Sequence, residues 1–182
     1  MNLFQFSQPE MLTFFAVLTR FSVMVIILPV IGDRFVPGPA KILFALAASF
    51  ALFPALVASK KIDPEEALVW GSTVGGMVGT IAIEVLVALV LGFVAKLVFD
   101  AIQFGSNLVG NFMGFAAATS FDPHQETQTQ VIAEIQVAIA MLLFLSLDGH
   151  HMMLQSALQS YDIVGLGRAQ FGAQMSEQLI HM

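Results

Sequence analysis

Long uncharged runs dominate the chain. Residues 11–31 carry no charge except Arg20, and residues 42–59 are uncharged throughout. Each run is close to the length that a helix needs to cross the hydrocarbon core of a bilayer. Pro54 lies inside the second run, where we expect it to bend the helix or end it early. The pattern therefore predicts at least two helices of membrane-spanning length.

A third run, residues 67–99, is too long for a single span. It holds only two charged residues, Glu84 and Lys96. As one helix it would measure roughly 50 Å, whereas crossing a bilayer takes about 30 Å. We therefore expect either two helices or one long helix that bends near the glycines at 71–79.

These runs predict an all-α, membrane-associated fold with one domain over residues 1–182. Capping residues with a proline in the first turn open three of the helices, at Ser7, Asp63 and Asp122. The expected helices are about 8–31, 40–58, 64–80, 81–108, 123–147 and 149–161, with a glycine-rich loop at about 109–122.

The composition supports a membrane or assembly partner. Of the 182 residues 57% are hydrophobic and 11% charged, with a net charge of -6, whereas soluble domains are about 25% charged. We therefore expect membrane lipid as a partner. With 7 Lys and Arg the chain has no basic stripe for nucleic acid, and without cysteine it has neither disulfides nor thiolate metal sites. No removable signal peptide is expected, because residues 1–10 contain no Lys or Arg.

Four charged residues lie within or beside the apolar runs: Arg20, Glu84, Lys96 and Asp100. Unpaired charge is costly there, so each needs a partner. Lys96 and Asp100 are four positions apart and face each other on a helix. Glu84 needs a partner from elsewhere, either Arg20 or a neighbouring subunit. These residues are either structural ion pairs, or, in a small proton-coupled transporter, Glu84 and Asp100 are the proton-carrying carboxylates.

Two glycine-rich patterns suggest close packing or an irregular segment. Gly71, Gly75 and Gly79 share one narrow helix face, where another backbone of the same chain or of another subunit can approach. Residues 103–123 combine glycines, alanines and phenylalanines without charge before Asp122. This composition is typical of a pore loop or plug that fills a cavity, or else of a kinked helix with small residues at its interface.

No catalytic constellation is present. The run Asp148-Gly149-His150-His151 lacks further ligands at metal spacing, and the chain contains no nucleophile or phosphate-binding motif. We expect no enzymatic activity, no cofactor and no metal.

The order of these features resembles the FliR family of flagellar biosynthetic proteins and its counterparts in virulence type III secretion. The residues that carry the resemblance are Leu28-Pro29, Val36-Pro37, Glu84, Gly92, Gly105, Gly110, Met113-Gly114-Phe115, Asp122-Pro123, Phe144-Leu145 and Asp148-Gly149-His150-His151. Together they extend over nearly the whole chain.

The resemblance implies a subunit of the flagellar export gate in the bacterial inner membrane, at the basal body. It implies FliP and FliQ as partners, together with FlhB and unfolded export substrates, and the virulence counterpart is the alternative. The family's plug falls on Gly110, Phe112, Met113, Gly114, Phe115 and Ala116 and continues to about Asp122. Family members usually continue with further apolar helices, a FliQ-like hairpin, whereas this sequence stops at Met182, so either the sequence is truncated or that part is absent.

Overall fold

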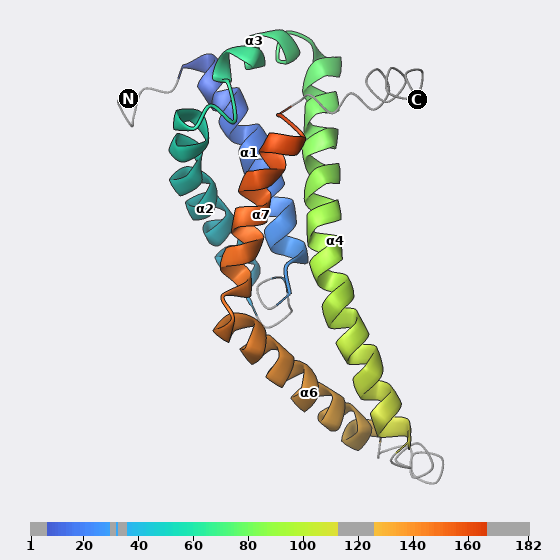
Figure 1. Ribbon diagram of the computed structural model, residues 1–182. Helices are drawn as coiled ribbons and strands as arrows, with labels where there is room; N and C mark the ends of the chain where they lie inside the picture. Colours follow the sequence, from blue (N-terminus) through green and yellow to red (C-terminus); the bar gives the residue numbers. More distant parts are fainter. Residues whose placement is uncertain (1–6, 30–31, 33–35, 113–125, 167–182) are drawn as a thin grey trace, which may run out of the picture.

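The computed structural model describes residues 7–29, 32, 36–112 and 126–166 (Figure 1). These residues form helices and contain no strand, which confirms the all-α fold. The elements are α1 (Gln8–Ile27), α2 (Gly38–Ala58), the 3-10 turn η1 (Pro64–Glu66), α3 (Ala67–Trp70), α4 (Val74–Phe112), α6 (Glu126–Ser146) and α7 (Gly149–Ile163).

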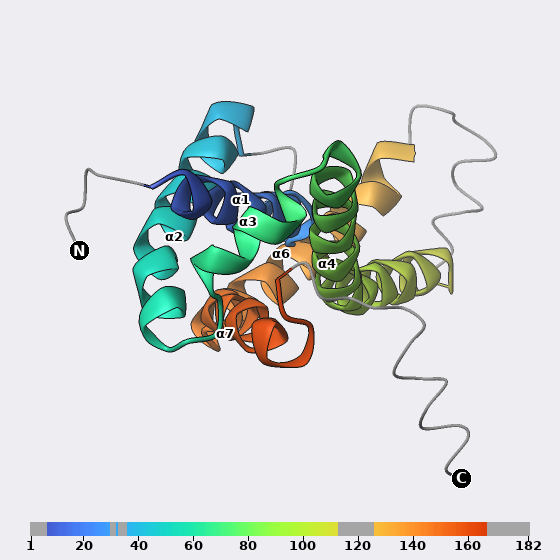
Figure 2. The same ribbon diagram turned by 90° about the horizontal axis from the view of Figure 1, so that it is seen from above.

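The helices form a bundle with a projecting arm. α1, α2, α7 and the first half of α4 lie side by side, while the second half of α4 runs on beyond them and meets α6 (Figure 1). Seen along the bundle, α1 lies between α2 and α4 with α7 on one side (Figure 2). The core accordingly centres on α1, whose buried residues are Thr13, Ala16, Val17, Arg20, Phe21, Met24 and Val25. This spacing of three and four buries one continuous face of the helix.

α1 ends four residues earlier than expected. The sequence suggested an end at about residue 31, but the last helical residue is Ile27. Leu28 has an extended conformation, with φ -58° and ψ 124°. The next residue is Pro29, whose ring disfavours helical geometry in the residue before it. The proline therefore fixes the end of the helix.

The third apolar run breaks near its start and not at its middle. The predicted helices 64–80 and 81–108 are wrong: a short η1–α3 turn ends at Trp70, and α4 then continues for 39 residues. Thr73 caps the start of α4, because its hydroxyl accepts a hydrogen bond from the Gly76 amide at 3.1 Å. α4 is consequently about 58 Å long, nearly twice the thickness of a hydrocarbon core.

The remaining helix ends lie within three residues of the predictions where they are described. α2 begins at Gly38 and continues through Pro54 to Ala58, so the proline does not end it. α6 begins at Glu126, and α7 extends to Ile163. The axes of α6 and α7 differ by 62°. Asp148 forms this elbow in the left-handed region, with φ 54°.

Among the described residues, three helices are long and apolar enough to cross a membrane: Gln8–Ile27, Gly38–Ala58 and Val74–Gly110. α1 and α2 form a hairpin about 30 Å long, which matches one hydrocarbon core. Gly92 of α4 lies against Ile27, so the first half of α4 reaches the same level as the end of α1. The rest of α4 extends past this level as the arm.

Candidate functional site

Arg20 and Glu84 come together because each lies on the buried stripe of its helix. Arg20 belongs to the buried face of α1. Glu84 belongs to a row on α4 in which every fourth residue is buried: Thr80, Glu84, Ala88 and Gly92. Both charged side chains are completely buried, at 0% exposure. The structure thus pairs Glu84 with Arg20, one of the two partners considered from the sequence.

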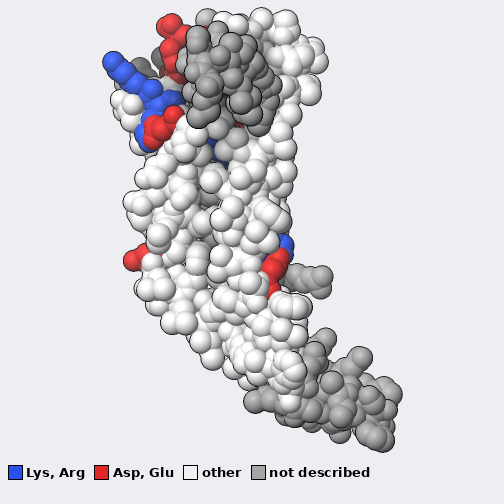
Figure 3. Space-filling model, turned by 45° about the vertical axis from the view of Figure 1, so that its right-hand side comes forward, with Lys and Arg blue, Asp and Glu red and all other residues white. Residues whose placement is uncertain are grey.

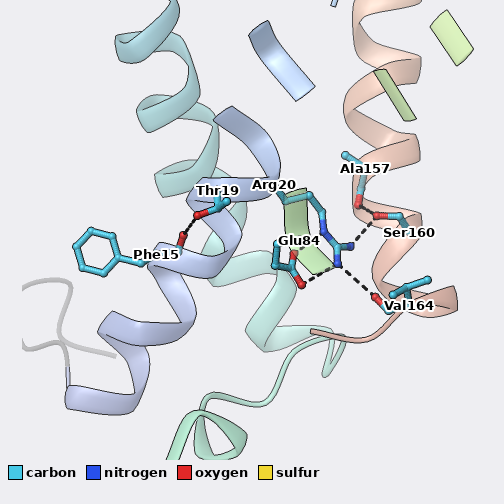
Figure 4. A network of polar contacts seen from close by, with 7 residues as sticks. All are labelled: Phe15, Thr19, Arg20, Glu84, Ala157, Ser160 and Val164. Carbon is cyan, nitrogen blue, oxygen red and sulfur yellow. Dashed lines mark hydrogen bonds and ion pairs between the residues drawn. The ribbon is translucent and has the colours of Figure 1, made fainter. Parts of the chain in front are cut away.

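The pair has bidentate geometry (Figure 4). The Arg20 Nε donates to Glu84 Oε2 at 2.6 Å, and Arg20 Nη2 donates to Glu84 Oε1 at 3.0 Å. Two parallel hydrogen bonds of this kind fix the relative orientation of the guanidinium and the carboxylate, as well as neutralising both charges. The pair therefore fixes how α1 and α4 lie against each other.

The end of α7 completes the environment of the guanidinium. Arg20 Nη1 donates to Ser160 Oγ at 2.8 Å, and Nη2 also donates to the Val164 carbonyl at 3.4 Å. Ser160 in turn donates to the Ala157 carbonyl at 2.6 Å. The guanidinium carbon lies 3.7 Å from the centre of the Tyr161 ring, a cation–π contact. Arg20 therefore joins α1, α4 and α7. We call this cluster the Arg20 hub; it comprises Arg20, Glu84, Ser160, Tyr161 and the Val164 carbonyl.

The geometry of the hub suits a structural role. A buried ion pair adds little net stability over a packed apolar core, but removal of one partner leaves an uncompensated charge. The described residues contain no group of three or more His, Asp or Glu that could hold a metal. The hub joins α1, α4 and α7 through the contacts of a single side chain, Arg20.

Lys96 and Asp100 form a separate pair on α4. The Lys96 Nζ lies 2.8 Å and 2.9 Å from the two carboxylate oxygens of Asp100. Both side chains are about half exposed, at 53% and 49%. They lie one and two turns past Gly92, beyond the level at which α1 ends. In Figure 3 most other charged side chains on the displayed face lie near one end, a single acidic group lies on the opposite edge, and most of this face is uncharged.

The three glycines at 71, 75 and 79 do not form one ladder, contrary to the expectation. Gly71 lies before α4, and a Cβ there would come within 2.7 Å of Leu12 Cδ1. Gly75 and Gly79 have open space around them. The close contact between helices occurs instead at Gly92, where a Cβ would lie 2.8 Å from both Cβ and Cγ2 of Ile27.

The first residues of the expected plug loop are helical. Residues 109–112 belong to the last turn of α4, so Gly110 and Phe112 are helical. Gly110 is buried, whereas Phe112 is 88% exposed. The remaining plug residues, Met113, Gly114, Phe115, Ala116 and Asp122, lie outside the described part of the chain.

Sequence reasoning did not identify the α7 side of the hub or the role of Gly92. Tyr161 is the only tyrosine of the chain and follows a serine in an amphipathic stretch, but nothing in that pattern points to Arg20. Gly92 had a usable signal, because it stands eight positions after Glu84 with Ala88 between them. That spacing places a small residue on the same helix face as the buried charge.

Long apolar helices around a buried ion pair define a helical membrane protein. The chain belongs to the family of bacterial export proteins, family 1, whose model matches residues 11–182. This confirms the resemblance drawn from the sequence.

Similar proteins include three flagellar biosynthetic proteins FliR. The protein of Caulobacter vibrioides is 27% identical over 153 residues, which are 84% of this chain and 58% of that protein. The Bacillus subtilis protein is 28% identical over 86% of this chain and 57% of its own length. The Escherichia coli protein is 26% identical over 85% of this chain and 56% of its own length. The chain thus spans somewhat more than half the length of these relatives.

Proposed function

We propose that the chain is a subunit of the flagellar type III export gate in the bacterial inner membrane, at the basal body. With FliP and FliQ it forms the channel through which unfolded flagellar substrates cross, next to FlhB. The observation that carries the proposal is the family match over residues 11–182, together with relatives that are flagellar biosynthetic proteins. The virulence-system gate is the alternative within the same class.

The unpartnered surface of the arm supports an assembly. α4 is about 58 Å long, and only 17% of its span-length segment is buried within the chain. Apolar side chains remain exposed on both helices of the arm, among them Phe104, Leu108, Leu142 and Leu143. A bilayer that surrounds the α1–α2 hairpin is too thin to cover the arm as well. Other subunits would bury this surface.

A proton-coupled transporter is a weaker candidate. Glu84 accepts two hydrogen bonds from Arg20 and is completely buried, so its carboxylate has no contact with water through which a proton could arrive. Asp100 lies sixteen positions away along α4, a distance of about 24 Å. A relay between these two carboxylates would need further proton carriers in between.

The proposed gate function includes a plug. Residues 113–122, with Met113, Gly114, Phe115 and Ala116, would block ion leakage until a substrate displaces them, and Gly110 with Phe112 would carry this segment at the end of α4. The support is the resemblance to the family and the small-residue composition of the segment, which is uncharged before Asp122.

Co-purification tests the export-gate proposal. The tagged chain is expressed with FliP and FliQ from the same genome, extracted in mild detergent and weighed by native mass spectrometry. A discrete complex that contains all three proteins is expected. A stable monomer or a homo-oligomer under these conditions would contradict the proposal, and ion transport by the reconstituted chain alone would favour the transporter.

A further inference from the structure

The buried face of α4 changes its partner helix where α1 ends. Gly92 lies against Ile27, the last residue of α1. Seven positions later, two turns further along the same face of α4, Phe99 packs against Phe144 of α6. Figure 1 shows α6 lying along the second half of α4, beyond the end of α1. α6 therefore covers the part of this face that α1 does not reach.

This change of partner requires a bend between α6 and α7. Ala157 and Tyr161 of α7 belong to the hydrophobic core of the bundle, whereas α6 belongs to the arm. The chain changes direction by 62° within two residues, Leu147 and Asp148. Asp148 has φ 54°, in the left-handed region that costs free energy for residues other than glycine. Such a conformation persists only where the surrounding packing determines it.

The ring of Phe144 supplies this packing. Gly149, the first residue of α7, lies so close to the ring that a Cβ there would overlap Cδ2 and Cε2 of Phe144. The glycine thus makes room for the ring, while Asp148 takes the left-handed conformation of the turn. The lack of a side chain at position 149 is what lets α7 start directly against α6.

The same ring also contacts α4. Phe144 and Phe99 meet edge to face, with their centroids 5.4 Å apart and their planes at 80°, an arrangement that attracts aromatic rings to each other. Both side chains are partly buried. A ring held from α4 in this way cannot move aside freely at the elbow. We call Phe99, Phe144 and Gly149 the Phe144 clamp, because they join α4, α6 and α7 at the base of the arm.

We propose that the Phe144 clamp is a conformational device that holds α6 at one fixed angle to α7 and keeps the arm from opening. α4 and α6 then form a rigid frame. For the segment that joins their far ends, the proposed plug, the clamp fixes the separation of the two supporting helices. This last consequence rests on the proposed function, whereas the fixed angle does not.

A distance measurement across the elbow tests the clamp. The chain contains no cysteine, so Ile135→Cys on α6 and Gln159→Cys on α7 provide a single pair of spin labels at exposed positions. At a bend of 62°, the rise of the helices places these positions about 30 Å apart, and a 20° change of the angle shifts that distance by about 3 Å. Pulsed electron paramagnetic resonance of the full chain in mild detergent should give one narrow distance distribution.

Changes at the clamp should alter this distribution. Gly149→Ala pushes a methyl group against the ring and should shift the mean distance by about 3 Å or more, and Phe144→Ala should broaden the distribution. Gly105→Ala is the matched control, because it adds the same methyl group in the arm where no atom lies within 4 Å of a Cβ. It should leave the distance unchanged.

A double variant separates the clamp from a local effect on the start of α7. The methyl group has room once the ring is absent, so Gly149→Ala should cause no further change in a Phe144→Ala background. An equal shift with and without the ring would overturn the proposal.

Phe99→Leu tests the clamp from α4 and leaves the sequence of the elbow intact, which keeps the test decisive where Gly149→Ala does not fold. It should broaden the distribution, whereas Phe93→Leu, at a position that is 56% exposed, should not. A narrow, unshifted distance in both Phe144→Ala and Phe99→Leu would overturn the proposal, as would a broad distribution in the chain with an intact clamp. The measurement needs neither export nor partner subunits, so the clamp and the export-gate proposal can fail separately.

Discussion

Arg20 and Glu84 are 64 positions apart in the sequence and form a bidentate ion pair with both side chains fully buried. The pair joins α1 to α4 at the level where the end of α7 also reaches the guanidinium through Ser160. The planar guanidinium of arginine has enough donors to bind groups on α4 and α7 at once. The single ammonium group of a lysine could not make the same bidentate pair. The hub therefore sets the mutual position of three helices with one side chain.

Glu84→Ala is expected to lower the free energy of unfolding by about 3–5 kcal/mol, because it leaves the Arg20 guanidinium buried without its carboxylate. The measurement is loss of helical circular dichroism as the purified chain in mild detergent is titrated with sodium dodecyl sulfate. Asp100→Ala is the matched control. It breaks the half-exposed pair with Lys96, and such pairs contribute about 0–1 kcal/mol.

Replacement of the whole pair should cost less than removal of one partner. The double variant Arg20→Met with Glu84→Met leaves no unpaired charge, and apolar replacements of buried pairs are often close to neutral. If the double variant were as unstable as Glu84→Ala, the loss would not come from an uncompensated charge.

Gly92→Ala is expected to destabilise the contact between α1 and α4. The new methyl group would lie 2.8 Å from Ile27 Cβ, an atom held by the backbone of α1, so the helices must move apart. Overpacking of this kind costs about 1–3 kcal/mol. The same detergent titration measures it.

Gly79→Ala supplies the control for this variant on the same helix. No atom lies within 4 Å of a Cβ at position 79, and alanine stabilises a helix interior by about 0.5–1 kcal/mol relative to glycine. An equal effect of the two substitutions would show that helix propensity, and not contact with Ile27, determines the result.

The Tyr161 ring is expected to matter more than its hydroxyl group. The hydroxyl is buried without a hydrogen-bond partner among the described residues, whereas the ring lies over the Arg20 guanidinium. Tyr161→Phe keeps the cation–π contact and should leave the stability unchanged or slightly raised. Tyr161→Ala should cost about 3–5 kcal/mol, like other large truncations in a core. A Tyr161→Phe variant as unstable as Tyr161→Ala would show that the hydroxyl makes an essential bond.

Local patterns predicted the helices, but the contacts between them depended on tertiary structure. Uncharged runs were sufficient to place α1 and α2, and an amphipathic stretch after Asp148 placed α7, since these signals act over a few positions. The break at 71–73 lies in the glycine region where a bend was expected, but the boundary between helices was predicted at 80/81, because the signal of Ser72-Thr73 is weak within a long apolar run. The need of Glu84 for a partner followed from its apolar surroundings alone. The contribution of Ser160 and Tyr161 did not, because the fold brings them to Arg20 across 140 positions.

A charge in the proposed plug should change export or membrane tightness. Gly114→Asp introduces a carboxylate into an uncharged segment, which would either hold the plug in the channel or prevent it from sealing. We expect loss of motility with retained substrates in the first case, and a fall in membrane potential in the second. Both are measured in cells whose only copy of the protein carries the variant, with swimming assays and a potential-sensitive dye.

Ser59→Asp adds the same charge at an exposed site after α2 and should leave both readings unchanged. Normal motility and a normal potential in the Gly114→Asp cells would contradict a plug and favour a scaffold without a moving part.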